Sequence, residues 1–209
     1  GNAYKEAKEV VDATYSTGST STASCFNFSN SLTTNRKDYN SIIMTFFKST
    51  CYEDYLPYMT KGNDVVLVVN TTNLFGDEAG ADDRNLDLFG DWDGGDIKYS
   101  FKYDIKEGTS GTDMIPAIRL SEMYYIMGEY FAYKDEFSKA GEMLDKVRYA
   151  RGISTTNLAS SIGSLEVFHT HLIKEMRREF VGEGQMFFQY KRLDQKPKDN
   201  VVFVFDKPN

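Results

Sequence analysis

The strongest constraint on the fold of this chain is a series of helical apolar stripes in its second half. Across residues 118–132, large apolar side chains recur at helical spacing on Leu120, Met123, Tyr124, Met127, Tyr130 and Phe131. Residues 137–150 repeat this spacing, and Gly152 follows at a position suited to ending a helix. The polar turn at residues 134–135 separates the two stripes. The pattern therefore predicts an antiparallel pair of amphipathic helices.

The same half of the chain predicts two more helices, over residues 164–181 and 185–193. Pro116 is expected at the start of the first helix, where its missing N–H costs least. Small residues predict a close approach within the helix pair: Gly128, Ala132, Ala140 and Gly141. The fold class predicted is mainly α, with tetratricopeptide-like helical hairpins, long irregular loops and a few short strands. The 34-residue repeat consensus itself is not matched.

The first half predicts only short elements. Residues 3–14 have the pattern of a helix, and residues 16–24, mostly Ser and Thr, that of a loop. Helical turns are expected over residues 38–48 and 52–59, and strands over residues 65–70 and 97–104. The tail at residues 201–205 is apolar and strand-like, and needs a surface to pack against.

Residues 71–111 are rich in acids and glycine. Eight acids and a single base, Arg84, fall between Asp77 and Asp96. Such a pattern is unfavourable for a helix, so this region is predicted to be a surface loop.

Composition excludes several classes of protein. The chain has 24 Lys and Arg against 31 Asp and Glu, a net charge of −7, which argues against a nucleic-acid partner. No apolar run approaches the roughly 20 residues of a membrane-spanning helix, and no signal sequence opens the chain. Two cysteines and two histidines make a structural zinc site improbable. Cys25 and Cys51 fit either a disulfide or two free thiols.

Three motifs in residues 114–193 resemble the C-terminal half of SusD/RagB-family proteins. The first contains Arg119, Leu120 and Glu122, and the second Val147, Arg148, Arg151 and Gly152. The third, in residues 173–193, contains Glu175, Arg177, Arg178, Glu179, Phe180, Glu183, Gly184, Phe188 and Arg192. The sequence departs from the family's usual residues at Met176, Gln185, Gln189 and Tyr190.

This resemblance implies a surface-exposed outer-membrane lipoprotein that binds a nutrient, most often a glycan, without catalysis or a cofactor. Its implied partner is a TonB-dependent transporter of the SusC type. Family members are typically more than twice as long and carry a lipid-attachment cysteine. Neither Cys25 nor Cys51 follows a lipobox, so contact with the membrane is expected only through an anchor absent from this chain. Residues 1–209 are therefore expected to form one SusD-like domain or its C-terminal portion, with residues 112–193 as the helical core.

The charged residues of the motifs are predicted to be structural rather than ligand-binding. They stand at spacings that bring opposite charges together on helices, as Glu175 and Arg178 do at i and i+3. Ion pairs between the helices are expected to fix their packing, with Arg178 and Glu122 as one candidate pair. The set is Arg119, Glu122, Arg148, Glu175, Arg177, Arg178, Glu179, Glu183 and Arg192.

The best candidate for a glycan site is the acidic loop around Trp92, the single tryptophan. An aromatic ring can cover the apolar face of a sugar while neighbouring carboxylates accept hydrogen bonds from its hydroxyls. Asp91 and Asp93 flank Trp92, and Tyr99 is a weaker companion. The alternative is that Trp92 pins its loop to the core.

Other chemistries have weaker support. Asp91, Asp93 and Asp96 offer oxygen ligands for calcium, but the EF-hand spacing is not met, and a solvated loop is favoured. His169 and His171 are two residues apart on a predicted helix and cannot share a metal. A glycosidase needs two convergent carboxylates, which nothing singles out. The main alternative to glycan binding is a tetratricopeptide-like protein-interaction module without its own glycan site.

Overall fold

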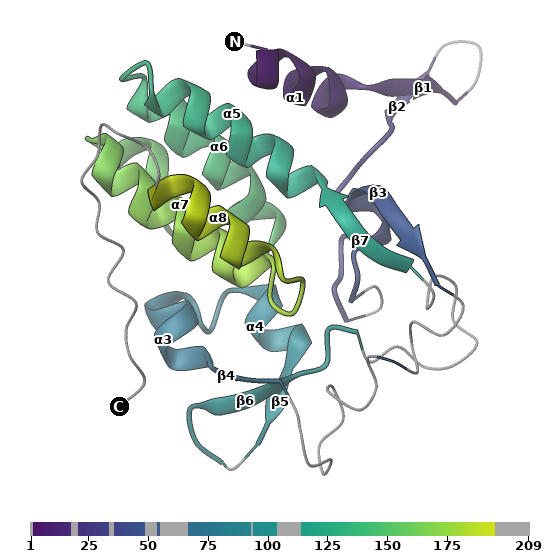
Figure 1. Cartoon of the computed structure of the whole chain (residues 1–209), viewed down its shortest axis with the longest axis vertical. Coiled ribbons are helices and arrows are strands. Elements are labelled where there is room, and N and C mark those ends of the chain that lie inside the picture. The colour runs from purple at the N-terminus through teal and green to yellow at the C-terminus, as the bar shows by residue number, and fades with distance from the viewer. Residues whose placement is uncertain are drawn as a thin grey trace.

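The computed structural model describes residues 2–17, 21–33, 36–48, 54, 67–92, 94–103 and 114–194. Its helices and strands come in the order α1 (Asn2–Asp12), β1 (Thr14–Ser16), β2 (Thr22–Ser24), η1 (Tyr39–Ser41), β3 (Ile42–Phe47), β4 (Val68–Asn70), α3 (Thr71–Phe75), η2 (Gly76–Glu78), α4 (Asp83–Leu88), β5 (Phe89–Asp91), β6 (Ile97–Ser100), β7 (Met114–Arg119), α5 (Leu120–Ala132), α6 (Phe137–Ala150), η3 (Leu158–Ser160), α7 (Leu165–Glu179) and α8 (Gln185–Asp194). Helices dominate, as the sequence predicts, and the mainly α fold class is confirmed (Figure 1).

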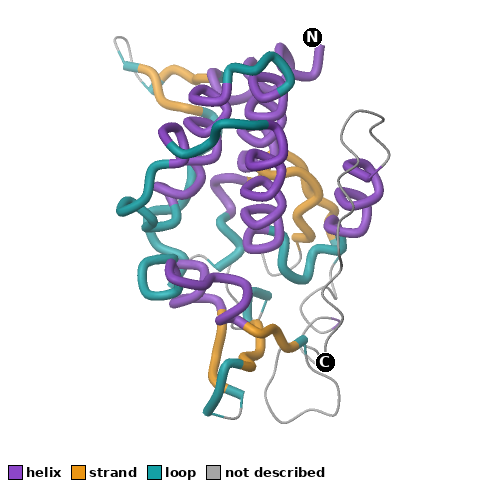
Figure 2. Tube along the Cα trace, turned by 90° about the vertical axis from the view of Figure 1, so that its left-hand side faces the viewer, coloured by secondary structure: helices purple, strands orange, loops and turns teal. Residues whose placement is uncertain are grey.

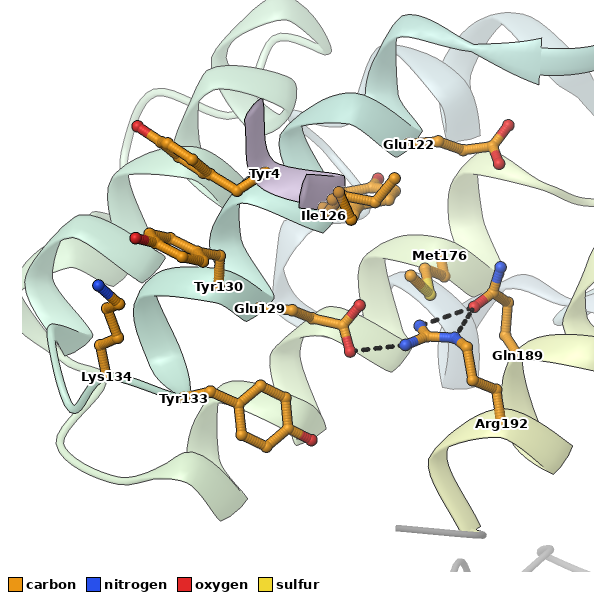
Figure 3. Close-up of a pocket in the computed structure, with 12 residues that line it drawn as sticks. Tyr4, Glu122, Ile126, Glu129, Tyr130, Tyr133, Lys134, Met176, Gln189 and Arg192 are labelled. Carbon is orange, nitrogen blue, oxygen red and sulfur yellow. Dashed lines mark hydrogen bonds and ion pairs between the residues drawn. The ribbon is translucent and has the colours of Figure 1, made fainter. Parts of the chain in front are cut away.

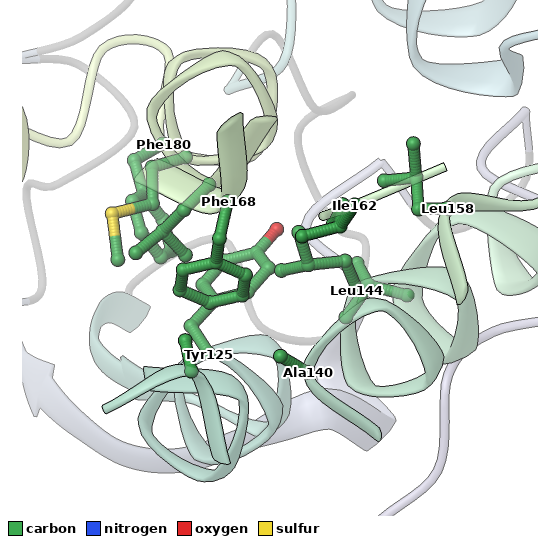
Figure 4. Packing of buried hydrophobic residues seen from close by; sticks show 11 residues of the cluster. Tyr125, Ala140, Leu144, Leu158, Ile162, Phe168 and Phe180 are labelled. Carbon is green, nitrogen blue, oxygen red and sulfur yellow. The ribbon is translucent and has the colours of Figure 1, made fainter. Parts of the chain in front are cut away.

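The predicted helix pair is α5 and α6, and α7 packs against both. Their shared core is a cluster of buried apolar side chains contributed mainly by these three helices (Figure 4). Its members are Tyr125, Ala132, Ala140, Leu144, Val147, Leu158, Ile162, Phe168, Leu172, Met176 and Phe180. α1 lies across α5, where the Tyr4 ring stacks on that of Tyr130 with centroids 4.2 Å apart. The apolar stripes of the sequence are thus the faces that this core buries.

Local signals define where these helices begin and end. The Glu122 carboxylate accepts the backbone N–H of Arg119 at 2.8 Å, which satisfies one free donor at the start of α5. Ser164 accepts the N–H of Val167 at 3.2 Å and caps α7. Gly152 has φ +83°, the left-handed conformation that follows the end of α6.

The region around residues 71–103 is folded rather than a surface loop, which corrects the prediction from its acid content. It contains the short helices α3 and α4 and an antiparallel sheet in the order β4-β6-β5. α4 begins at Asp82, whose carboxylate accepts the N–H of Arg84 at 3.0 Å. A second buried cluster lies beneath these elements, made of Leu32, Leu74, Phe75, Leu88 and Phe89. Figure 2 shows the sheet at the opposite end of the molecule from the N-terminal helix.

Two two-stranded sheets, β3-β7 and β1-β2, lie where the sequence predicts other elements. Residues 42–47 form β3, which pairs antiparallel with β7, instead of the helical turn expected there. Pro116 lies within β7, opposite Thr45, and α5 begins only after Arg119. Each of these strands is at an edge of its two-stranded sheet, where a proline is tolerated. The ends of the Ser/Thr-rich segment form the β1-β2 pairing rather than a loop.

Several predicted elements lie wholly or partly outside the described residues. They include the helical turn at 52–59, the first part of the strand at 65–70 and the apolar tail at 201–205. Cys25 is exposed with a free thiol, and Cys51 is among the residues not described.

The close packing at Gly141 predicts that a larger side chain there destabilises the fold. A Cβ there would lie 2.6 Å from the backbone of Leu158 and Ala159, so Gly141 allows η3 to rest directly on α6. We expect Gly141→Ala to lower the free energy of unfolding by about 1 kcal/mol or more, since overpacking against backbone outweighs the gain in helix propensity. Gly163→Ala is the control, because no atom lies within 4 Å of its added Cβ. Urea unfolding that finds the Gly141 variant as stable as the wild type would contradict this packing.

Candidate functional site

A network of buried ion pairs joins the charged residues of α7 to the rest of the molecule. Arg84, 1% exposed, donates to Asp82 at 2.8 Å and Glu175 at 2.8 Å, and lies 3.2 Å from Glu179. Arg151 binds Glu179 at 2.5 Å and Asp38 at 2.7 Å. The network therefore connects α7 with α4, the end of α6 and the segment before η1.

Arg178 extends the network towards α3. Its guanidinium binds Glu175 at 2.9 Å and Glu78 at 2.7 Å, and donates to the carbonyl oxygens of Leu74 and Phe75 at 3.1 and 2.8 Å. Its partners are therefore α7 itself, the last turn of α3 and η2. The expected Arg178–Glu122 pair is replaced by these contacts, and Glu122 instead caps α5.

Glu183 is the centre of an adjoining cluster. Its Oε1 accepts from Arg119 at 2.6 Å, from Lys102 at 2.6 Å and from the Tyr103 hydroxyl at 2.7 Å. Lys102 also donates to the carbonyl oxygen of Glu179 at 2.6 Å. This cluster fixes the turn after α7 to β7 and to the end of the sheet region.

For the acids Glu78 and Glu179, ion pairing outweighs the effect of burial on the pKa, whereas for Lys102 burial outweighs pairing. Burial raises the pKa of the Glu179 carboxyl, but Arg151 and Arg84 outweigh this and hold it well below its usual range. Burial opposes ionisation of Glu78 as well, yet Arg178 and Arg148 lower its pKa to about 2. Burial lowers the pKa of Lys102 despite its contact with Glu183.

The network offers no room for a ligand. The cavity between Asp38, Arg84, Arg119 and Glu179 has a volume of about 10 Å³, the space of about one water molecule. Its charged groups pair with one another, which is the arrangement of a structural element rather than of a binding site.

The remaining charged residues of the motifs lie at the edges of this network. Arg148 binds Glu78 at 2.7 Å. Arg192 on α8 binds Glu129 on α5 at 2.8 Å. Arg177 is exposed on α7, away from the buried pairs. Sequence reasoning missed Arg84, which stands alone among eight acids; that isolation was the available signal.

Trp92 lies directly after β5, in the connection to β6, and its side chain is half-buried. Asp91 is exposed, and its carboxylate accepts the N–H of Gly94 at 2.9 Å, which closes the turn. Asp93 is outside the described residues. The turn thus contains a half-buried tryptophan that follows an exposed aspartate in the sequence.

Tyr99 lies on β6 rather than in the turn. It is paired with Gly90 of β5 and Val68 of β4, and its ring covers the position where Gly90 lacks a side chain. The ring centroid is 5.7 Å from that of Phe101. Tyr99 is half-buried, and packing accounts for these contacts.

The described residues contain no group of three or more His, Cys, Asp or Glu side chains arranged to hold a metal ion. Asp96 accepts the Thr72 hydroxyl at 2.7 Å and anchors the turn to α3. His169 is buried beside Tyr133, and His171 lies two residues further along α7.

A groove that sequence reasoning did not find lies between α1, α5 and α8 (Figure 3). Its volume is about 620 Å³, within the range of small-molecule sites. The lining residues are Ala3, Tyr4, Glu122, Tyr125, Ile126, Glu129, Tyr130, Tyr133, Lys134, Met176, Gln189 and Arg192. They come from four segments far apart in the sequence, so no local motif could have revealed the groove.

The model of the SusD family matches residues 96–203, just over half of the chain. The chain belongs to the SusD family. This match confirms the resemblance drawn from the three motifs. A search of curated proteins finds no match.

Solved structures of SusD proteins have the same fold. A SusD superfamily protein from Bacteroides thetaiotaomicron superposes with a TM-score of 0.63 at 23% identity, over 91% of this chain and 45% of that one. Surface glycan-binding protein A from Bacteroides uniformis superposes with a TM-score of 0.60 at 18% identity, over 90% of this chain and 43% of that one. A SusD-like carbohydrate binding protein from Bacteroides vulgatus superposes with a TM-score of 0.53 at 23% identity, over 75% of this chain and 35% of that one. This SusD chain thus spans less than half the length of these structures.

No helix in the described part of this SusD chain has both the length and the apolar character needed to cross a membrane.

The ion-pair network predicts that removing one of its buried partners destabilises the fold. Glu179→Ala would leave Arg84 and Arg151 buried with one partner fewer, and we expect a loss of about 3–5 kcal/mol in the free energy of unfolding. Glu166→Ala is the matched control, because Glu166 is exposed on the same helix, and its change is expected to stay within about 0.5 kcal/mol. Equal denaturation midpoints for the two variants would show that the network contributes no net stability.

Proposed function

We propose that this SusD-family protein binds a glycan at the outer-membrane surface without catalysis and passes it to a TonB-dependent transporter of the SusC type. The observation that carries the proposal is the family match across residues 96–203. Two of the similar structures are described as a carbohydrate binding protein and a surface glycan-binding protein. A lipid anchor would hold the protein to the membrane.

The turn between β5 and β6 is the proposed glycan site. Trp92 supplies an aromatic face, and Asp91 and Asp93 supply carboxylates that accept hydrogen bonds from sugar hydroxyls. Tyr99 has the lesser role of supporting the sheet behind the turn, where it packs over Gly90.

One observation favours the alternative of a protein-interaction module. Phe187 and Phe188 on α8 are 69% and 68% exposed, and their rings meet edge to face at 5.4 Å. Large exposed apolar side chains that lie together are typical of protein contact surfaces. Such a surface also suits a protein that docks on a transporter.

Trp92 provides the test, because it is the only tryptophan in the chain. We expect a panel of oligosaccharides to include one that changes the intrinsic fluorescence on titration. Trp92→Ala should weaken its binding about five- to tenfold in calorimetry, since an aromatic contact of this kind contributes about 1 kcal/mol.

Leu86→Ala is the matched control, because Leu86 is exposed on the neighbouring helix α4. No response to any saccharide, combined with capture of the transporter by the same protein, would favour the interaction module. Release of reducing sugar from a polysaccharide would instead indicate a glycosidase.

A further inference from the structure

The groove between α1, α5 and α8 combines an apolar floor with a polar rim. Ile126 and Met176 lie along its floor, and the Tyr133 ring, 39% exposed, stands at one end (Figure 3). Tyr4 and Tyr130 form a wall through their stacked rings, which fix α1 to α5. An apolar surface bounded by a rigid aromatic wall is suited to the C–H face of a sugar ring.

The polar rim is held in place before any ligand arrives. Arg192 donates to the Glu129 carboxylate at 2.8 Å and, with two of its nitrogens, to the Gln189 side-chain oxygen at 2.8 and 3.0 Å. This geometry fixes the Gln189 side chain with its amide N–H groups as donors at the edge of the groove (Figure 3). Groups held rigidly in advance lose little entropy when a ligand binds.

The lining of the groove contains both acids and bases. Two acids, Glu122 and Glu129, stand with two bases, Lys134 and Arg192. Burial raises the pKa of the Glu122 carboxyl to about 7, although the backbone N–H of Arg119 acts in the opposite direction. Near neutral pH this carboxyl is therefore partly protonated and can donate as well as accept hydrogen bonds. A balanced rim of donors and acceptors fits a neutral polyhydroxylated molecule better than an ion.

We propose that this groove is a second binding site, which takes a short neutral saccharide. It is distinct from the Trp92 turn, since its lining comes from α1, α5, α7 and α8, whereas that turn joins β5 to β6, at the other end of the molecule from α1 (Figure 1). Two of its lining residues, Met176 and Gln189, stand where the sequence departs from the SusD/RagB signature. The saccharide class rests on the proposed function, whereas the existence of the site rests on the groove.

The test separates the two sites by calorimetry with the same oligosaccharide panel. Ile126→Trp fills the groove without removing any of its ion pairs, and Val167→Trp places the same ring on an exposed part of α7 as a control. We expect the wild type and the Val167 variant to bind two equivalents, and the Ile126 variant to bind one. Trp92→Ala should retain the groove site and lose or weaken the other.

Thermal melting checks that each variant is folded, and Gln189→Ala provides a second probe if Ile126→Trp is not. In the Gln189→Ala variant, we expect the affinity of the groove for the saccharide to fall about tenfold, while Arg192 keeps its contact with Glu129. Unchanged stoichiometry and affinity in the groove variants would overturn the groove site and leave the proposed function intact.

Absence of saccharide binding in the wild type would overturn both proposals. If Ile126→Trp raises the melting temperature and changes no saccharide titration, the groove is a surface that another polypeptide segment covers, and the saccharide site is wrong.

Discussion

The buried carboxylate of Glu179 is the point on which the rest of this structure depends. Removing a carboxylate from water costs several kcal/mol, so it can be buried only where cations and donors surround it. Here Arg84 and Arg151 approach it from α4 and from the end of α6. Arg84 also binds Asp82 and Glu175, and Arg151 also binds Asp38. The ion pairs thereby attach α4 and the segment before η1 to the helical core.

This arrangement also determines where ligands can bind. The centre of the molecule is filled by apolar packing and by paired charges along α7. Open surfaces with aromatic and polar groups lie at the periphery, at the β5–β6 turn and in the groove beside α1. The signature residues of α7 thus serve the fold, and both proposed ligand sites lie outside the buried network.

The helical half of the fold could be predicted from the sequence because its signals are local. Apolar periodicity, the cap at Ser164 and the glycine at 152 depend only on neighbouring residues. α4 could not be predicted in this way, because its acidic surroundings disfavour a helix until Arg84 meets Glu175, which is 91 residues away. The strand β3 was likewise missed, since its pairing with β7 is a long-range contact that overrides local propensity.

The two candidate sites differ in the same way, since one could be predicted from the sequence and the other could not. Trp92 could be found because a single tryptophan in an acidic, glycine-rich segment is conspicuous in the sequence. The groove could not, since its floor, wall and rim come from α1, α5, α7 and α8, and none of these helices carries a binding motif of its own. Its recognition required the packing of the helices to be known.

A double-mutant cycle between Arg84 and Glu175 is the most direct test of the central role of the buried network. The two side chains are nearly fully buried and 2.8 Å apart. Urea unfolding of Arg84→Met, Glu175→Gln and the double variant should give an interaction free energy of about 0.5–3 kcal/mol, with the double variant less destabilised than the sum of the singles. Additive losses would contradict the account, because the two charges would then stabilise the fold independently of one another.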